Sequence, residues 1–119
     1  MMSHLAVSSH WMVHYLNADM HESAAKRAEE AHAFATFDQG FARRHEAALA
    51  ALHQRLGLDY CVIDCGETQD GQLLLFEADT AMIVHAMDSI ELYPYKRPQM
   101  LRIFQAFQAL LDRRAQRGG

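Results

Sequence analysis

Apolar residues recur at helical spacing in the first half of this chain. Residues 19–37 and 41–56 are expected to form two helices. Asp19 is a candidate cap for the first helix, because Glu22 lies three residues on and can close a capping box. Gly57 is well placed to end the second helix, since glycine readily adopts the left-handed conformation of a helix C-terminus.

The middle of the chain alternates with the period of two that is typical of strands. Residues 59–66 and 72–79 predict two strands, and Asp70-Gly71 between them is a strong hairpin signal. A short strand is also expected at residues 4–8. Residues 80–86 either extend the second hairpin strand or leave it.

The last third of the chain predicts a loop followed by a helix. Pro94 and Pro98 each disfavour helical geometry in the preceding residue, and Pro98 suits the first helical position. The pattern therefore predicts an α+β domain, a small antiparallel sheet with a central β-hairpin covered by two or three amphipathic helices. The apolar face of the final helix is expected to lie in the core, and it comprises Met100, Ile103, Phe104, Phe107, Leu110 and Leu111.

Length and composition narrow the functional classes. The 119 residues favour one domain spanning 1–119, and the net charge of -4 argues against a nucleic-acid partner. No apolar run reaches the roughly 18 residues of a membrane span, so no membrane partner is expected. No basic and apolar leader is visible, and cysteines are few, so a cytoplasmic location is the expectation.

Three acidic residues fall on the predicted hairpin. Alternation places Glu77 and Asp79 on one face of the second strand. If Glu67 pairs with Leu74, Asp64 faces Glu77 across the ladder, and a shift of two residues makes the two diagonal neighbours. Like charges placed opposite each other destabilise a sheet.

Such a cluster of carboxylates has three usual resolutions. It can bind a cation, raise its pKa values or lie fully in solvent. The neighbouring Leu75 and Val62 suggest that water is scarce, and oxygen-only ligands favour Mg²⁺. Asp64, Glu77 and Asp79 are therefore candidate metal ligands. The alternative is a solvated outer face that carries three ordinary surface acids.

Two segments of the chain resemble a known enzyme superfamily. Residues 56–64, LGLDYCVID, resemble the helix-end, Leu-Gly, strand, Asp element of ATP-grasp enzymes, and residues 70–79, DGQLLLFEAD, resemble their exit strand, which ends in Glu-x-Asn. The gap of 13 from Asp64 to Glu77 and the turn glycine also agree with that superfamily. The resemblance covers roughly residues 41–114, the C-terminal part of an ATP-grasp domain.

The resemblance implies a chemistry for these residues. In ATP-grasp ligases the Asp and the Glu hold Mg²⁺ ions that bridge the phosphates of ATP while a carboxylate becomes an acyl phosphate, which an amine then attacks. The resemblance implies the same Mg²⁺-binding role for Asp64 and Glu77. Asp79 stands where the superfamily has Asn, and Val62 stands where many relatives carry a phosphate-binding Arg.

Unlike a complete ATP-grasp enzyme, the chain does not contain the residues that would bind the nucleotide. Lys26 and Lys96 are its only lysines, and it contains no glycine-rich phosphate loop. The resemblance therefore implies the Mg²⁺-binding C-terminal part of a carboxylate–amine ligase, inactive alone, which binds ATP only when a partner chain supplies the N-terminal lobe. The alternatives are a non-catalytic homodimeric module for binding or assembly and a regulatory or structural domain unrelated to ATP. Apolar surface left bare by the missing lobe favours a homo-oligomer.

Other residues are weaker candidates. Lys96 and Arg97 form a small basic spot that could bind a phosphate or a substrate carboxylate, although a solvated helix start is the simpler interpretation. His10 and His14 would have zinc-binding spacing on a helix, but packing or substrate contact is the favoured interpretation. His85 is either a base near the hairpin or an ordinary strand-end histidine.

The two cysteines are not expected to form a disulfide. Cys61 and Cys65 share one face of the first predicted strand and lie about 13 Å apart at about 3.3 Å per residue. A disulfide cannot span that distance, so both are expected to be buried thiols.

Overall fold

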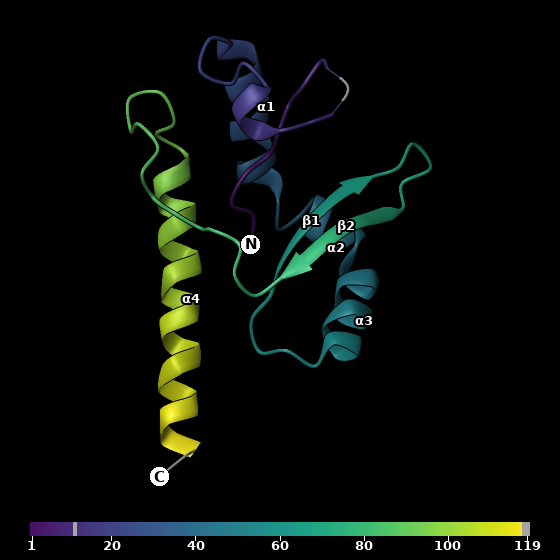
Figure 1. The fold of residues 1–119 in the computed structure, drawn as a ribbon, viewed down its shortest axis with the longest axis vertical. Helices are drawn as coiled ribbons and strands as arrows, with labels where there is room; N and C mark the ends of the chain where they lie inside the picture. Colours follow the sequence, from purple (N-terminus) through teal and green to yellow (C-terminus); the bar gives the residue numbers. More distant parts are fainter. Residues whose placement is uncertain (11, 118–119) are drawn as a thin grey trace.

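The computed structural model describes residues 1–10 and 12–117, which form a mixed α+β fold around a two-stranded antiparallel hairpin (Figure 1). This confirms the fold class predicted from the sequence. The long C-terminal helix lies beside the first α-helix, and the hairpin lies between that pair and two short consecutive helices. In chain order the elements are η1 (Tyr15–Asn17), α1 (Ala24–Thr36), α2 (Phe41–Arg44), α3 (Glu46–Leu56), β1 (Val62–Glu67), β2 (Leu73–Asp79) and α4 (Lys96–Arg117).

The hairpin turn forms where the Asp-Gly signal predicts it. Gly71 has φ 79°, a left-handed conformation that glycine adopts without steric cost. The Gly71 N–H donates to the Thr68 carbonyl at 2.9 Å, and the Thr68 N–H donates to the Gln72 carbonyl at 2.9 Å. The Thr68 hydroxyl adds a hydrogen bond to Asp70 at 2.5 Å. The turn is thus fixed by local chemistry.

A β-bulge interrupts the ladder in the middle of the hairpin. Asp64 pairs with Glu77, but the next residue, Cys65, pairs with Leu75, so Phe76 is the extra residue on β2. The predicted pairing of Glu67 with Leu74 is therefore one residue out, although the predicted opposition of Asp64 and Glu77 is present. An uninterrupted alternation cannot reveal such an insertion.

Helix α1 begins later than the sequence pattern indicates. Its N-cap is Ser23, whose hydroxyl accepts a hydrogen bond from the Lys26 N–H at 3.3 Å. Asp19 instead has φ 53° and lies in the turn before the helix, where its carbonyl accepts from the Ser23 N–H at 3.0 Å. The predicted cap at Asp19 is wrong because this turn inserts four residues before helical geometry begins.

The predicted helix over residues 41–56 is divided in two. His45 has φ -103° and ψ 14°, so it forms a turn between α2 and α3. Its buried side chain lies with Nε2 3.3 Å from Glu67 Oε2, a tertiary contact that the periodicity does not contain. Gly57 ends α3 as predicted, with φ 62° and its N–H donating to the His53 carbonyl at 3.0 Å.

The segments at residues 4–8 and 80–86 are both irregular in the structure. Residues 4–8 form no strand, and the Leu5 N–H donates to Glu30 Oε1 at 3.0 Å in place of a ladder partner. Residues 80–86 leave the sheet and cross toward α4. The strand predicted at residues 4–8 is therefore wrong, because a carboxylate from α1 satisfies the backbone there.

Helix α4 starts at Lys96, so Pro98 lies at its third position, within the first turn where backbone N–H groups have no helical partner. Its apolar stripe is buried only in part, since Met100 lies in the core as predicted but Phe104 is 40% exposed and Phe107 41% exposed. Within residues 1–10 and 12–117, no helix has the length and apolar character needed to cross a bilayer.

The buried core is small for a chain of this mass. The accessible surface is 8735 Å², whereas a folded monomer of 13.5 kDa exposes about 6,500 Å². The radius of gyration is 15.6 Å, against roughly 13.5 Å for a typical globule of this length. The chain thus leaves roughly 2,200 Å² more surface in solvent than its mass predicts. Its buried apolar residues are Ala18, Met20, Phe34, Tyr93 and Met100.

Candidate functional sites

The three acids of the hairpin share one face of the sheet. Asp64 lies directly opposite Glu77, and Asp79 lies two residues further along β2, opposite Val62. All three are exposed, so the expectation that water is scarce around them is wrong, and solvent weakens their mutual repulsion. The bulge contributes to this, because it moves Leu75 opposite Cys65 and away from the acidic pair.

The acidic face is open and is not a closed cage of ligands. Asp79 Oδ1 accepts a hydrogen bond from the Ala81 N–H at 2.9 Å, which holds this carboxylate at the end of β2. In the described part of the chain, the carboxylates of Asp64, Glu77 and Asp79 do not gather within 4.8 Å of one another as a set of three. The backbone brings the three acids together, while their side chains extend into solvent.

The thiol of Cys65 lies next to this face. Partial burial raises the pKa of Cys65, and the negative charge of Asp64 raises it further. Cys61 and Cys65 are both free thiols, as the predicted separation requires, and both are half-buried, in contrast to the full burial expected. Cys65 can therefore report on the charge at Asp64.

The far end of β1 is tied to the short helices by an ion pair. Arg44 Nη2 lies 2.7 Å from Glu67 Oε2, and His45 Nε2 lies 3.3 Å from the same oxygen. The hydrogen bond from Arg44 lowers the pKa of Glu67, and the contact with His45 lowers it further. This contact fixes α2 and α3 relative to the hairpin.

A buried polar network lies between α1 and α4, and sequence patterns did not predict it. Glu30 is 0% exposed. Its Oε1 accepts from the Leu5 N–H at 3.0 Å, and its Oε2 accepts from the hydroxyls of Tyr15 at 3.1 Å and Tyr95 at 2.7 Å. Burial raises the pKa values of Tyr15 and Tyr95 far above the ordinary range, and the Glu30 charge adds to the effect. Both phenols therefore remain protonated donors.

Lys96 belongs to this network and is 2% exposed. Its ammonium group lies 3.6 Å from Glu30 Oε1, donates to Asp88 Oδ2 at 3.3 Å and to the Tyr15 hydroxyl, and lies over the rings of Tyr15 and Tyr93 at 4.3 and 4.4 Å. The solvated helix start expected at this position is wrong for Lys96. Arg97, the other residue of the predicted basic spot, is exposed.

A second cluster lies beside this network, at His4, His85 and Asp88. One potential ligand atom from each residue lies within 4.8 Å of the other two. Partial burial lowers the pKa of His4, and the neighbouring Lys96 charge lowers it further. No local spacing links positions 4 and 85, so neither sequence interpretation of His85, a base near the hairpin or an ordinary strand-end histidine, includes this cluster.

The predicted histidine pair near the N-terminus is not on a helix. His10 is exposed, with Nε2 3.6 Å from Asp19 Oδ2, and His14 has an extended backbone before η1. Trp11, between them in sequence, lies outside the described residues. The helical spacing on which the zinc hypothesis for this pair depended is therefore missing at His14.

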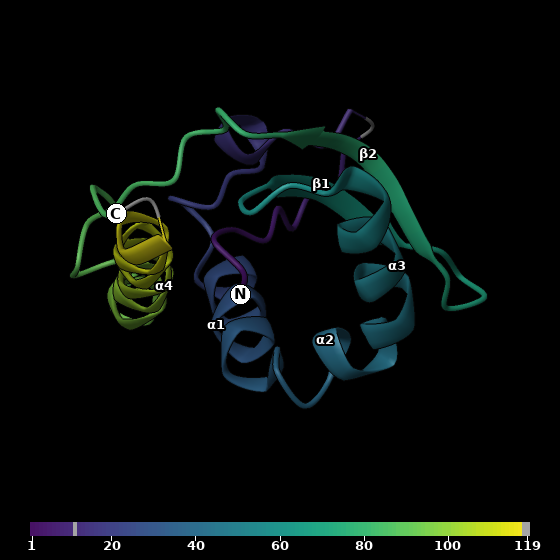
Figure 2. The same ribbon diagram turned by 90° about the horizontal axis from the view of Figure 1, so that it is seen from below.

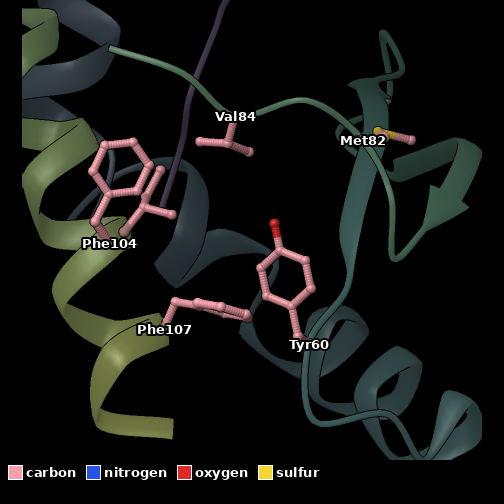
Figure 3. A pocket seen from close by; sticks show the side chains of 6 residues that line it. Tyr60, Met82, Val84, Phe104 and Phe107 are labelled. Atoms are coloured by element: carbon pink, nitrogen blue, oxygen red, sulfur yellow. The ribbon is translucent and has the colours of Figure 1, made fainter. Parts of the chain in front are cut away.

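A large trough is lined by residues of α1, α2, α3, β1 and α4, and Figure 2 shows how these elements are arranged in an arc. Its volume is about 960 Å³, and much of its lining is apolar, including Leu49, Leu52 and Ile63. A smaller cavity of about 210 Å³ lies between α4 and the chain that follows β2, where the Tyr60 and Phe107 rings meet edge to face with centroids 5.1 Å apart (Figure 3). The two hollows share five lining residues, among them Tyr60 and Phe107, so they are adjoining parts of one apolar region.

Comparison with known proteins adds no relationship to this geometry. The chain matches no protein-family profile, no curated protein and no solved structure. The resemblance to ATP-grasp enzymes therefore depends on the residues of the chain alone.

Proposed function

We propose that this chain is the Mg²⁺-binding C-terminal part of an ATP-grasp-like, ATP-dependent carboxylate–amine ligase, inactive on its own. The observation that carries the proposal is the pairing of Asp64 with Glu77 in one antiparallel hairpin, with Asp79 next on the same face. Side chains directly opposite each other have Cβ atoms about 4.5–5.5 Å apart. Rotamer changes alone can therefore turn both carboxylates toward one ion.

The residues fit a hard divalent cation. Mg²⁺ prefers carboxylate oxygens and keeps several waters or phosphate oxygens in its shell, which suits an exposed and incomplete set of protein ligands. Asp64 and Glu77 would hold the ion, and Asp79, whose Oδ1 accepts a hydrogen bond from the Ala81 N–H, would complete its shell with the other oxygen. Bound Mg²⁺ would supply charge neutralisation for the phosphates of ATP.

The nucleotide cradle must come from outside these residues. The ammonium group of Lys96 already pairs with Glu30 and Asp88, so Arg97 is the remaining residue of the basic spot that could bind a phosphate or a substrate carboxylate. The apolar trough and the exposed face of α4 offer surface on which a lobe carrying the missing lysines could pack. ATP binding is then expected only when that partner chain is present.

Calorimetric titration with Mg²⁺ tests the metal site directly. We expect weak binding by the unmodified chain and loss of binding in the double variant Asp64→Asn, Glu77→Gln. Glu91→Gln is the matched control, because Glu91 is an exposed acid away from the hairpin. Equal Mg²⁺ binding by the double variant and the control would contradict the proposal.

The second candidate is a non-catalytic homodimeric module for binding or assembly. The roughly 2,200 Å² of excess surface favours it, because a standard interface buries about 800 Å² per partner and obligate dimers bury more. Light scattering distinguishes the candidates. A stable dimer that neither binds Mg²⁺ at the hairpin nor hydrolyses ATP with any added lobe supports the module, whereas a monomer that gains nucleotide binding with a lysine-bearing lobe supports the ligase.

Both candidates include a cytoplasmic location and no nucleic-acid partner. The small number of cysteines supports the first, since disulfide-rich chains belong to oxidising compartments. The net charge of -4 supports the second, because phosphate backbones bind surfaces rich in Lys and Arg. Fractionation and a salt-dependent DNA-binding assay would test these two points.

A further inference from the structure

The cluster of His4, His85 and Asp88 joins two segments that have no regular secondary structure. His4 belongs to the N-terminal segment, whereas His85 and Asp88 belong to the connection between β2 and α4. His4 Nε2 lies 3.9 Å from Asp88 Oδ2, and the two imidazole rings lie 5.6 Å apart between centroids. All three residues are half-buried, so an ion held there would have protein on one side and solvent on the other.

The surroundings of this cluster carry one uncompensated negative charge. Glu30 and Asp88 contribute two negative charges, and Lys96, which contacts both, contributes one positive charge. Glu30 already accepts three hydrogen bonds, so Asp88 is the acid whose oxygens can still accept a further bond or bind an ion. Since the partial desolvation of a net negative charge is unfavourable, a cation beside Asp88 would be stabilised despite the neighbouring ammonium group.

Two of the three side chains are already oriented by neighbours outside the cluster. The His4 ring packs edge to face on Tyr15, with centroids 4.8 Å apart, and Asp88 is held by Lys96 at 3.3 Å. His85 Nδ1 accepts a hydrogen bond from the Met87 N–H at 3.2 Å. In that tautomer the His85 Nε2 carries the proton, so ligation by either nitrogen requires the Met87 hydrogen bond to break.

We infer that His4, His85 and Asp88 form a binding site for a zinc-class transition-metal ion, separate from the acidic face of the hairpin. Two imidazoles and one carboxylate are a donor set suited to Zn²⁺ or Co²⁺, whereas Mg²⁺ prefers oxygen ligands alone. Three protein ligands leave a fourth position for water or an added ligand. The ion would clamp the N-terminal segment to the connection that leads into α4.

Zn²⁺ titration of the full chain tests this site. We expect one Zn²⁺ per chain, a rise in melting temperature on binding, and no displacement by a large excess of Mg²⁺. His85→Asn is expected to weaken Zn²⁺ binding by roughly tenfold or more, since losing a ligand costs at least as much as losing its support. His53→Asn is the matched control, because His53 is an exposed histidine on α3. Co²⁺ would report the site by the strong visible absorption of its four-coordinate form.

Two further measurements keep the inference open to disproof if a ligand variant is unstable. In the unmodified chain, Zn²⁺ should shift the amide resonance of Met87 and speed its hydrogen exchange, because ligation of His85 releases that N–H. His4→Gln should reduce binding without altering Mg²⁺ binding at the hairpin. Absence of Zn²⁺ binding, equal binding by His85→Asn and His53→Asn, or an unchanged Met87 amide would each overturn the inference. None of these outcomes bears on the proposed Mg²⁺ site.

Discussion

The ammonium group of Lys96 lies 3.6 Å from Oε1 of Glu30, and this contact joins the first residue of α4 to the buried face of α1. Both side chains are almost completely withdrawn from water, yet neither is left without partners. The α1–α4 pair is thus held by a charged network in addition to a small core, in which Phe34 of α1 and Met100 of α4 are both buried. A network of this kind stabilises a fold only while it is complete.

Removal of the Lys96 charge should therefore destabilise the protein strongly. Lys96→Met leaves Glu30 as a buried and uncompensated carboxylate, and breaking a buried pair in this way costs about 3–5 kcal/mol. Urea denaturation followed by circular dichroism measures the change. Arg102→Met is the control, because Arg102 pairs with Asp38 at 3.0 Å on the surface, where an ion pair contributes about 0–1 kcal/mol. Similar losses in the two variants would show that the Glu30 network does not stabilise the fold.

The contact between Arg44 and Glu67 should be visible in a pH titration. Arg44 lowers the pKa of Glu67, so Arg44→Gln should move that pKa up toward its ordinary value near 4.5. Because the folded pKa is depressed, the stabilising effect of this carboxylate is complete above the unfolded value and disappears as pH falls through the folded value. Carbon-detected NMR of the Glu67 carboxyl group measures the shift. Arg43→Gln, a neighbouring exposed change, should leave the titration of Glu67 as it is.

The reactivity of Cys65 should report on a cation bound at Asp64. Burial and the Asp64 charge raise the pKa of this thiol, and only the thiolate reacts with iodoacetamide. Asp64→Asn should lower the pKa and speed alkylation at neutral pH. Bound Mg²⁺ should do the same in the unmodified chain, because it offsets the same charge. Mass spectrometry of alkylated Cys65, with Cys61 as an internal reference, gives the rates. A Mg²⁺ effect that persists in Asp64→Asn would place the ion elsewhere.

Local chemistry explains which parts of the structure the sequence could predict. The turn at Gly71, the C-cap at Gly57 and the opposition of Asp64 and Glu77 all depend on residues close together in the chain or on a short hairpin. The bulge at Phe76 was missed, because the pattern of alternation gives no sign of an inserted residue. The turn at His45 was missed as well, since its cause is a contact with Glu67 across the fold.

Long-range pairing explains the remaining failures. The burial of Lys96 is a consequence of Glu30, which is 66 positions earlier in the chain, and a charged residue at a helix start gives no local indication of such a partner. His4 and His85 are brought together in the same way. The stripe on α4 is expected in the core because its spacing is that of a buried helix face, but the pairing of α4 with α1 is small and covers the stripe only in part.

The exposed stripe on α4 leads to the final prediction. Phe104 and Phe107 are about two-fifths exposed, so replacing both with Ser removes apolar surface that is only partly buried in the isolated chain. The change also removes the contact of Phe107 with Tyr60, which contributes about 0.5–1.5 kcal/mol. If this face is covered by a second copy or by a partner lobe, the same change removes aromatic residues from the interface, where they contribute most to affinity.

The double change Phe104→Ser, Phe107→Ser is therefore expected to abolish association while leaving a folded monomer. Light scattering at several protein concentrations measures the self-association, and circular dichroism checks the fold. Gln105→Ser and Gln108→Ser provide the control, because both lie on α4 and neither adds apolar surface. A dimer that persists after the phenylalanine changes would indicate that the interface lies at the other side of the trough, near Leu49 and Leu52. If the unmodified chain is monomeric and remains so at high concentration, self-association is excluded and a partner lobe remains as the candidate to cover this face of α4.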